Sequence, residues 1–166
     1  MDEIDRMLLE ILQQDATLSL AQMAERVGLS PTPCWKRIQK LEASGVIKCR
    51  VAIVDPVRVG VGLSVLVSVE AGEHTPDWLQ RFSAGIQAMP EVMEVYRTAG
   101  EVDYVLRVAV ADMAQYDAFY KRLIAIAPMK NITSRFAMER IKHTTAYPLH
   151  PRAFRDRRAA DNENEE

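Results

Sequence analysis

Lysine, glutamine and aromatic side chains recur at helical spacing between residues 30 and 45. Lys36, Gln39 and Lys40 fall on the face of a predicted helix opposite the apolar positions Ile38 and Leu41. Lysine contacts backbone phosphates, glutamine reads base edges, and an aromatic ring packs on a sugar or a thymine methyl group. The pattern predicts a surface that reads double-stranded DNA; the alternative is a solvated amphipathic helix in a three-helix core. The candidate DNA contacts are Ser30, Thr32, Pro33, Trp35, Lys36, Gln39, Lys40, Lys48 and Arg50.

Positive charge is concentrated on this stretch rather than spread over the chain. Residues 30–50 hold five basic side chains and one acidic one, whereas the whole chain of 166 residues has a formal net charge of −2. Phosphate binding requires a local excess of positive charge, and a mildly acidic total does not oppose it. The charge pattern therefore favours the DNA-reading interpretation.

Three helices and a strand must position these side chains. Ser19 and Gln22 have the spacing of a capping box at the start of the second helix, and Ser30 caps the third. The order ends in a run rich in β-branched residues, which predicts a strand. In outline this is a winged helix-turn-helix over residues 1–54. The expected elements are helices over 2–15, 20–27 and 31–44 and a strand over 46–55.

The rest of the chain predicts a separate unit, which makes the protein α+β. Residues 55–62 contain Pro and Gly and form a linker, and the tail over 149–166 is rich in charge and predicts disorder. Between them, over 63–148, strands and helices alternate as βαββαβ, the ferredoxin-like topology. The expected elements are strands over 63–71, 92–99, 103–110 and within 131–147, and helices over 76–88 and 112–126.

Alternation of side chains predicts how this second unit packs. Leu79, Phe82 and Ile86 are expected to face inward from its first helix. Two helices cover only one face of such a sheet. We assign the apolar side of the first strand to the uncovered face, which would then pack on a second copy of the chain. That apolar side consists of Leu63, Val65, Val67 and Val69.

The sequence Gly100-Glu101-Val102-Asp103 could bind a small zwitterion. Gly100 permits a tight turn in which a ligand approaches backbone N–H groups, and these donors suit a carboxylate. Asp103 offers an acceptor for an ammonium group. The alternative is that Gly100 makes a hairpin and Asp103 is a turn residue.

Other classes of site have little support in the sequence. Cys34 and Cys49 form no disulfide framework, and Cys34 lies on the inner helix face as a core residue rather than a sensor. The three histidines are scattered, so no metal site or other cofactor is expected. No run of 18 apolar residues predicts a transmembrane helix, and the N-terminus is unlike a signal peptide. These features predict a cytoplasmic protein.

Three motifs together resemble the Lrp/AsnC family of transcription regulators: DRMLLEILQQD (5–15), LSPTPCWKRIQKLEASGVI (29–47) and TAGEVDYVLRV (98–108). The resemblance covers residues 2–148. It implies a winged helix-turn-helix followed by a βαββαβ domain, with homodimers that assemble into tetramers or octamers. It also implies an amino-acid effector bound between dimers near the Gly-x-x-Asp motif. The residues implied to bind the effector are Thr98, Ala99, Gly100, Asp103, Tyr104, Thr133 and Ser134.

A finer resemblance points to the cysteine-responsive members of that family. It is carried by TPCWKRIQKLEASGVI (32–47), VAIVDPVRVGVGL (51–63) and FAMERIKHTTAYPL (136–149). It implies L-cysteine as the effector.

Two other functions remain open on sequence alone. An ACT-like amino-acid-binding metabolic module, or an enzyme, could share the ferredoxin-like topology, because fold does not fix function. A nucleophile–base pair, a phosphate loop or a carboxylate pair in a cleft would support an enzyme, and the sequence lacks them. A corepressor that binds ligand without DNA is disfavoured by the basic surface over 30–50.

Overall fold

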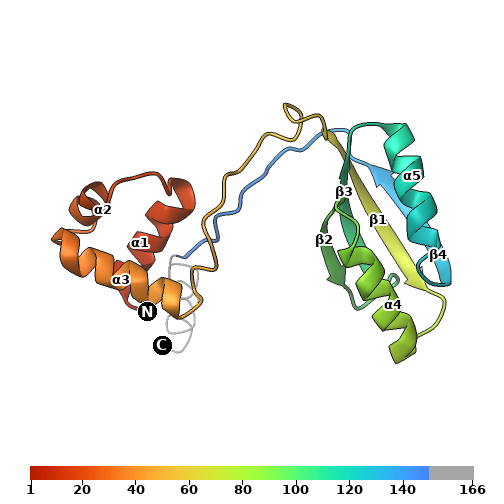
Figure 1. The fold of residues 1–166 in the computed structure, drawn as a ribbon, viewed down its shortest axis with the longest axis horizontal. Coiled ribbons are helices and arrows are strands. Elements are labelled where there is room, and N and C mark those ends of the chain that lie inside the picture. The colour runs from red at the N-terminus through yellow and green to blue at the C-terminus, as the bar shows by residue number, and fades with distance from the viewer. Residues whose placement is uncertain (150–166) are drawn as a thin grey trace, which may run out of the picture. The chain divides into compact units, whose positions relative to one another are not determined.

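The computed structural model describes residues 1–149, which form two units. The first comprises residues 1–52 together with the returning segment 142–149, and the second comprises residues 53–141 (Figure 1). The chain therefore passes from one unit to the other twice. The tail that was expected to be disordered lies, from residue 150 on, outside the described residues. Within 1–149, no helix is long and apolar enough to cross a membrane.

Three helices form the first unit, as the sequence predicts. The predicted capping box of Ser19 with Gln22 is present, and the first helix starts with another one, Asp2 with Asp5. Ser30 also stands at an N-cap, although its side chain makes no capping hydrogen bond. The helices are α1 (Glu3–Gln14), α2 (Leu20–Arg26) and α3 (Pro31–Ala43).

A small apolar core fixes α3 on the other two helices. Cys34 is fully buried, and burial raises the pKa of its thiol, so this side chain fills space as a neutral group. Gly28 has φ of 68°, a left-handed conformation that glycine adopts without strain at the turn after α2. The buried core residues are Leu8, Met23, Ala24, Val27, Cys34 and Ile38.

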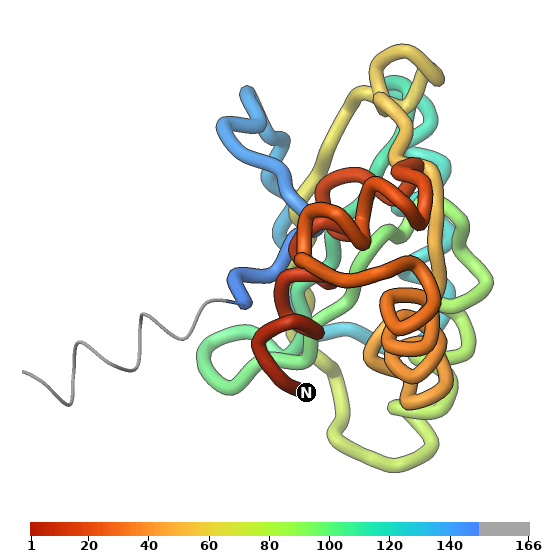
Figure 2. The backbone as a smooth tube through the Cα atoms, turned by 90° about the vertical axis from the view of Figure 1, so that its left-hand side faces the viewer, coloured from red at the N-terminus to blue at the C-terminus, as the bar shows by residue number. Residues whose placement is uncertain are grey.

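The strand predicted over 46–55 is wrong. Residues 46–62 contain no helix or strand, only a turn at 56–60, which is the gold loop of Figure 2. Val51, Ile53 and Val54 are exposed there. A β-branched composition needs a neighbouring strand to complete its backbone hydrogen bonds, and the described residues provide none for this segment.

The returning segment is attached to α1 by two hydrogen bonds with the side-chain amide of Gln13. The Gln13 amide nitrogen donates to the Tyr147 carbonyl oxygen at 3.2 Å, and the Tyr147 N–H donates to the Gln13 side-chain oxygen at 2.7 Å. One glutamine thereby satisfies both backbone groups of one residue.

The second unit has the ferredoxin-like topology that the sequence predicts. Its four strands form one antiparallel sheet in the order β2-β3-β1-β4, so the two strands nearest the middle are β1 and β3. The elements are β1 (Leu63–Ala71), α4 (Pro76–Gln87), β2 (Val92–Arg97), β3 (Tyr104–Val110), α5 (Met113–Ile124) and β4 (Met129–Phe136).

The apolar side of β1 faces the helices, which corrects the assignment to the uncovered face. Val65, Val67 and Val69 are completely buried in a core to which both helices contribute. The assignment was wrong because two helices supply far more apolar surface than the open face can. The core residues from α4 and α5 are Trp78, Phe82, Ile86, Tyr116, Phe119 and Leu123.

The opposite face of the sheet is polar and crossed by ion pairs. Leu66 of β1 lies between Arg107 of β3 and Arg135 of β4 in the strand register. Arg107 pairs with Glu94 at 2.7 Å, and Arg135 donates to the Ser68 hydroxyl at 2.9 Å. This face therefore lacks the continuous apolar surface that the sequence led us to expect.

On α4, Trp78 takes the inward place that was assigned to Leu79. Trp78 is 1% exposed and stacks with Phe82 and Tyr104, whereas Leu79 is 38% exposed. The buried stripe of α4 runs through Trp78, Phe82 and Ile86, and Leu79 lies at its edge. Burial of the larger indole ring stabilises the fold more than burial of a leucine side chain would.

Gly85 of α4 packs closely against Ile126, which lies just after α5. A Cβ at this position would lie 2.6 Å from Cγ2 of Ile126, a stiff β-branched side chain. Alanine in place of a mid-helix glycine normally stabilises by about 0.5–1 kcal/mol. We expect Gly85→Ala instead to lower the free energy of unfolding by roughly 1–3 kcal/mol, because of overpacking. Chemical denaturation measures it.

The control for this prediction is the same change in an Ile126→Ala background. Gly85→Ala should become neutral or stabilising there, since the clashing atoms are gone. A stabilising effect of Gly85→Ala in the wild-type background would contradict the packing described here.

Candidate DNA-reading helix and effector loop

The two faces of α3 are sorted as the sequence predicts. Cys34, Ile38 and Leu41 are buried, whereas Trp35 is 51% exposed. Helical periodicity places the basic and amide side chains on the exposed side of α3, while its inner side packs in the core of the first unit. All nine candidate DNA contacts are exposed, seven of them from Ser30 to Lys40 and two on the extended segment after α3.

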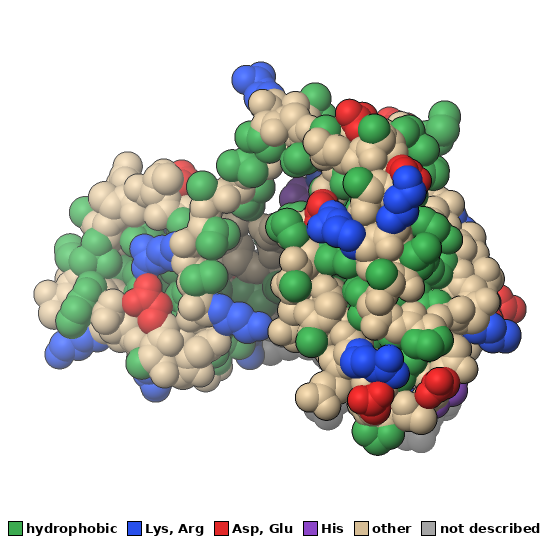
Figure 3. Space-filling view, turned by 45° about the vertical axis from the view of Figure 1, so that its right-hand side comes forward, with side chains coloured by type: hydrophobic (Ala, Val, Ile, Leu, Met, Phe, Trp, Pro, Cys, Tyr) green, Lys and Arg blue, Asp and Glu red, His purple; other side chains and the backbone are tan. Residues whose placement is uncertain are grey.

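Glu42 engages two of these candidates. One of its carboxylate oxygens accepts from the Gln39 amide at 2.9 Å, and the other accepts from Arg50 at 2.8 Å. Within residues 1–149, by contrast, Lys36, Lys40 and Lys48 form no ion pair. The lysines are therefore free to meet phosphates, while Gln39 and Arg50 must first leave a carboxylate. Figure 3 shows lysine and arginine side chains over the first unit, with an acidic group among them.

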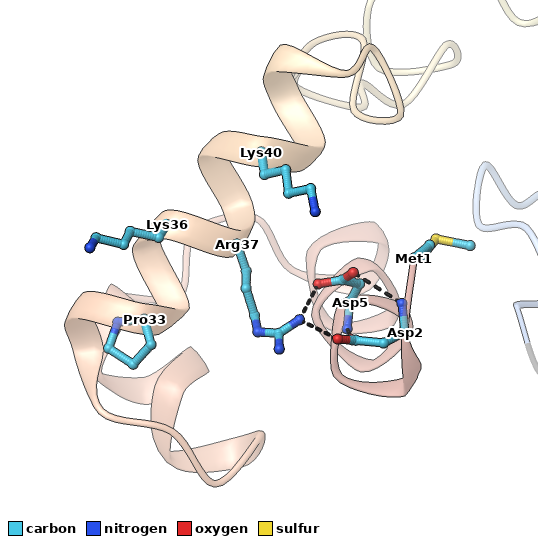
Figure 4. Close-up of a pocket in the computed structure, with 7 residues that line it drawn as sticks. All are labelled: Met1, Asp2, Asp5, Pro33, Lys36, Arg37 and Lys40. Carbon is cyan, nitrogen blue, oxygen red and sulfur yellow. Dashed lines mark hydrogen bonds and ion pairs between the residues drawn. The ribbon is translucent and has the colours of Figure 1, made fainter.

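A basic residue outside the predicted set lies beside this surface. Arg37 turns away from Lys36 and Lys40 and reaches the start of α1, where its Nη1 lies 2.6 Å from Asp2 and 2.7 Å from Asp5 (Figure 4). The Asp5 amide and the Arg37 guanidinium both hydrogen-bond the Asp2 carboxylate and hold its pKa below the ordinary value. The sequence gives no sign of this contact, because 32 residues separate Arg37 from Asp5.

An open pocket of about 520 Å³ adjoins these groups (Figure 4). It lies between the start of α1 and the exposed side of α3. Its lining residues are Met1, Asp2, Asp5, Pro33, Lys36, Arg37 and Lys40.

The loop between β2 and β3 is held by Asp103. The Asp103 backbone N–H donates to the Val69 carbonyl at 3.0 Å, and its carboxylate accepts from the Ala71 N–H at 2.8 Å. The Thr98 N–H donates to the Asp103 carbonyl at 2.9 Å. One carboxylate oxygen therefore fastens the loop to the end of β1, as the hairpin interpretation requires.

The other features of this loop leave room for a ligand. Gly100 has φ of 146°, and a Cβ built there would meet no atom within 4 Å, so the backbone can be approached from outside. The second oxygen of Asp103 lies 3.8 Å from Nε2 of His74. His74 is a neighbour that sequence reasoning missed, because it lies 29 residues from Asp103 and matches no motif.

The structure brings together only some of the predicted effector residues. Thr98, Ala99 and Gly100 are exposed on the loop beside Asp103. The others are Tyr104, which is buried in the helix-covered core; Ser134, whose hydroxyl is hydrogen-bonded to Tyr116; and Thr133, which pairs with Ser68 on the open face.

The described part of the chain has no candidate metal site. Residues 1–149 contain no group of three or more His, Cys, Asp or Glu side chains placed to hold a metal ion.

Two family models cover most of the chain. Residues 1–48 match the winged helix-turn-helix DNA-binding model, and residues 64–147 match the Lrp/AsnC ligand binding domain. The chain belongs to the Lrp/AsnC family. It is a DNA-binding transcriptional regulator with a ligand-binding domain of this type.

Individual relatives agree over nearly the full length. The chain is 49% identical over 150 residues to the DNA-binding transcriptional activator DecR of Escherichia coli strain K12, covering 90% of this chain and 99% of the relative. Its fold is similar to that of an AsnC family transcriptional regulator from Agrobacterium tumefaciens, with a TM-score of 0.87 at 54% identity over 90% of this chain and 97% of the other. These relatives are regulators rather than enzymes, which decides against the enzyme alternative.

A further similar structure carries a ligand. A transcriptional regulator from Neisseria meningitidis, solved as a complex with L-methionine, has a TM-score of 0.86 at 32% identity. The match covers 90% of this chain and 97% of the other.

The Glu42 contacts generate a prediction about charge. Glu42→Gln removes one negative charge and releases Arg50 and Gln39. We expect tighter DNA binding and a steeper dependence of log K on log salt, by up to about one unit, because one more cation can displace counterions. Fluorescence anisotropy across a salt series measures both quantities.

Glu25→Gln on α2 is the matched control, because it removes the same charge from an exposed glutamate on a different helix. If the two variants bind DNA equally tightly, the increase in affinity comes from net charge alone, and Glu42 does not restrain Arg50.

Proposed function

We propose that the exposed side of α3, with the segment after it, reads the major groove and its phosphates through the nine candidate residues. The carrying observation is that Lys36 and Lys40, which form no ion pair within residues 1–149, extend from a helix whose inner side is fixed in the core. A rigid helix with outward cations and an exposed aromatic ring fits the groove. Gln39 is the candidate for base reading, once Glu42 releases it.

Two substitutions separate phosphate contact from base reading. Lys40→Ala should weaken binding to all sequences alike and lower the salt slope by about one. Gln39→Ala should cost roughly 1–3 kcal/mol on a specific fragment and relax the base preference. The DNA is a genomic fragment that copurifies with the protein, compared with a shuffled fragment of equal length. If both folded variants bind like the wild type, α3 is not the reader.

We further propose that the loop over 98–103 binds a small amino acid, with L-cysteine as the leading candidate. The open backbone at Gly100 would receive the carboxylate, and the Asp103 oxygen nearest His74 would accept the ammonium group. L-Cysteine is favoured by the resemblance of segments 32–47, 51–63 and 136–149 to cysteine-responsive members. The L-methionine complex of the Neisseria regulator supports an amino acid as the ligand class.

The protein should act as a homo-oligomer, a dimer that assembles into tetramers or octamers. Large apolar side chains are exposed on the two extended segments that join the units, and a surface of this kind is usually covered by another chain. A second copy is the occupant we propose, with the effector bound where the loop meets a neighbouring dimer. The exposed side chains are Val51, Ile53, Val54, Val57, Val59, Met138 and Ile141.

Titration with cysteine, serine, alanine, leucine and methionine tests the effector. The preferred amino acid should shift DNA affinity or the sedimentation profile, because a ligand that binds one state more tightly shifts the equilibrium toward it. Asp103→Asn keeps an oxygen for the Ala71 N–H but loses the charge, so affinity for the amino acid should fall about tenfold or more. Basal DNA binding should remain.

Glu101→Gln removes the same charge from the same loop and serves as the control. Normal ligand response in Asp103→Asn, or no binding of any of the five amino acids, would remove the loop from the proposal.

A further inference from the structure

The three neighbouring basic residues of α3 serve two different surfaces. Among the described residues, Lys36 and Lys40 have no acidic partner, whereas Arg37, one residue after Lys36, is turned onto α1 (Figure 4). Its side chain is 32% exposed, and both of its acidic partners lie in the first turn of α1 or at its cap. Helical spacing places Arg37 beside the buried stripe of α3, three residues after Cys34 and four before Leu41, and so outside the nine candidate DNA contacts.

The acidic side of this contact is itself built into a helix cap. The Asp5 N–H donates to one oxygen of Asp2 at 2.9 Å, and the Asp2 N–H donates to one oxygen of Asp5 at 3.1 Å. The remaining oxygen of each carboxylate meets the same nitrogen of Arg37. All four carboxylate oxygens are therefore in use, and the bridge ties α3 to the end of α1 whose backbone is most firmly capped.

The location of the bridge matters because Asp5 is 8% exposed. A buried carboxylate that loses its cation keeps a large desolvation penalty, so the helices would shift to expose it. The open pocket beside the bridge has Lys36 and Lys40 in its wall, and it provides the space for such a shift.

We propose that Arg37 is a positioning residue for DNA reading. Its bridge to Asp2 and Asp5 sets the rotation of α3 on α1, and with it the placement of Lys36, Gln39 and Lys40 in the groove. Arg37 itself does not contact DNA. This inference rests on the proposed role of α3 as the reader.

Asp5→Asn gives a test in which the two explanations have opposite signs. If only charge mattered, loss of an acidic group near the DNA would tighten binding, as expected for Glu42→Gln. If the bridge positions α3, specific binding weakens although the protein becomes more positive. We expect the ratio of specific to non-specific affinity to fall roughly fivefold to tenfold, with non-specific affinity kept or raised. The probes are a copurifying genomic fragment and its shuffled counterpart.

Arg37→Gln is the second single variant of a double-mutant cycle with Asp5→Asn. It should lower the same ratio, and the double variant Asp5→Asn/Arg37→Gln should be no worse than either single variant, because all three break one bridge. Asp2→Asn, at a more exposed carboxylate, is the milder variant if Asp5→Asn folds poorly. Circular dichroism at the assay temperature establishes that the variants are folded, and a role in stability alone would leave the affinity ratio unchanged.

The outcomes separate this inference from the proposal that it rests on. If Lys40→Ala flattens the salt slope but the bridge variants keep the wild-type ratio, Arg37 has no positioning role. If Asp5→Asn tightens specific binding and Arg37→Gln flattens the slope as Lys40→Ala does, Arg37 is a direct phosphate contact. If Lys40→Ala and Gln39→Ala change nothing, α3 is not the reader, and both proposals fall.

Discussion

In the central strand β1, every second side chain from Val65 to Val69 is completely buried, and this alternation constrains the whole second unit. A shift in register by one residue would bring Leu66 and the polar Ser68 into the core and move the valines to the open face. The same register sets the effector loop, because Asp103 is hydrogen-bonded to Val69 by its N–H and to Ala71 by its carboxylate. The position of the loop that carries Gly100 thus depends on the packing of the β1 valines beneath the helices.

In the first unit, the distribution of charge around α3 matters mainly for binding a polyanionic partner. The core of this unit is small. Within residues 1–149, the basic side chains on or near α3 fall into three groups: paired with α1 (Arg37), paired with Glu42 (Arg50), or unpaired (Lys36, Lys40 and Lys48). An exposed ion pair such as Arg50–Glu42 contributes little to stability, typically less than about 1 kcal/mol. Its larger effect is on a polyanionic partner, because each cation already neutralised by the protein is one fewer that displaces counterions from DNA.

Much of this architecture could be predicted from local patterns in the sequence. Helix α1, the capping box at Ser19, the inner side of α3 and the order βαββαβ could be predicted. They follow from hydrophobic periods of three to four residues in helices and two in strands, and from side chains that satisfy nearby backbone groups. The Gly100–Asp103 loop is readable for the same reason, since a hairpin and its glycine are local. Each of these features involves residues within a few positions of each other.

The features that the sequence did not determine all involve partners far along the chain. Residues 46–55 have the composition of a strand, yet a strand exists only if another one pairs with it. The burial of the apolar side of β1 under the helices was decided by competition between two faces, and the choice of Trp78 over Leu79 by the space beside Phe82 and Tyr104. Likewise, no local pattern indicates that Arg37 pairs with Asp2 and Asp5, because only the tertiary fold brings α1 beside α3. Local periodicity fixes which side chains share a face, but only the tertiary fold decides what that face meets, because burial and charge pairing are energies between segments rather than properties of one.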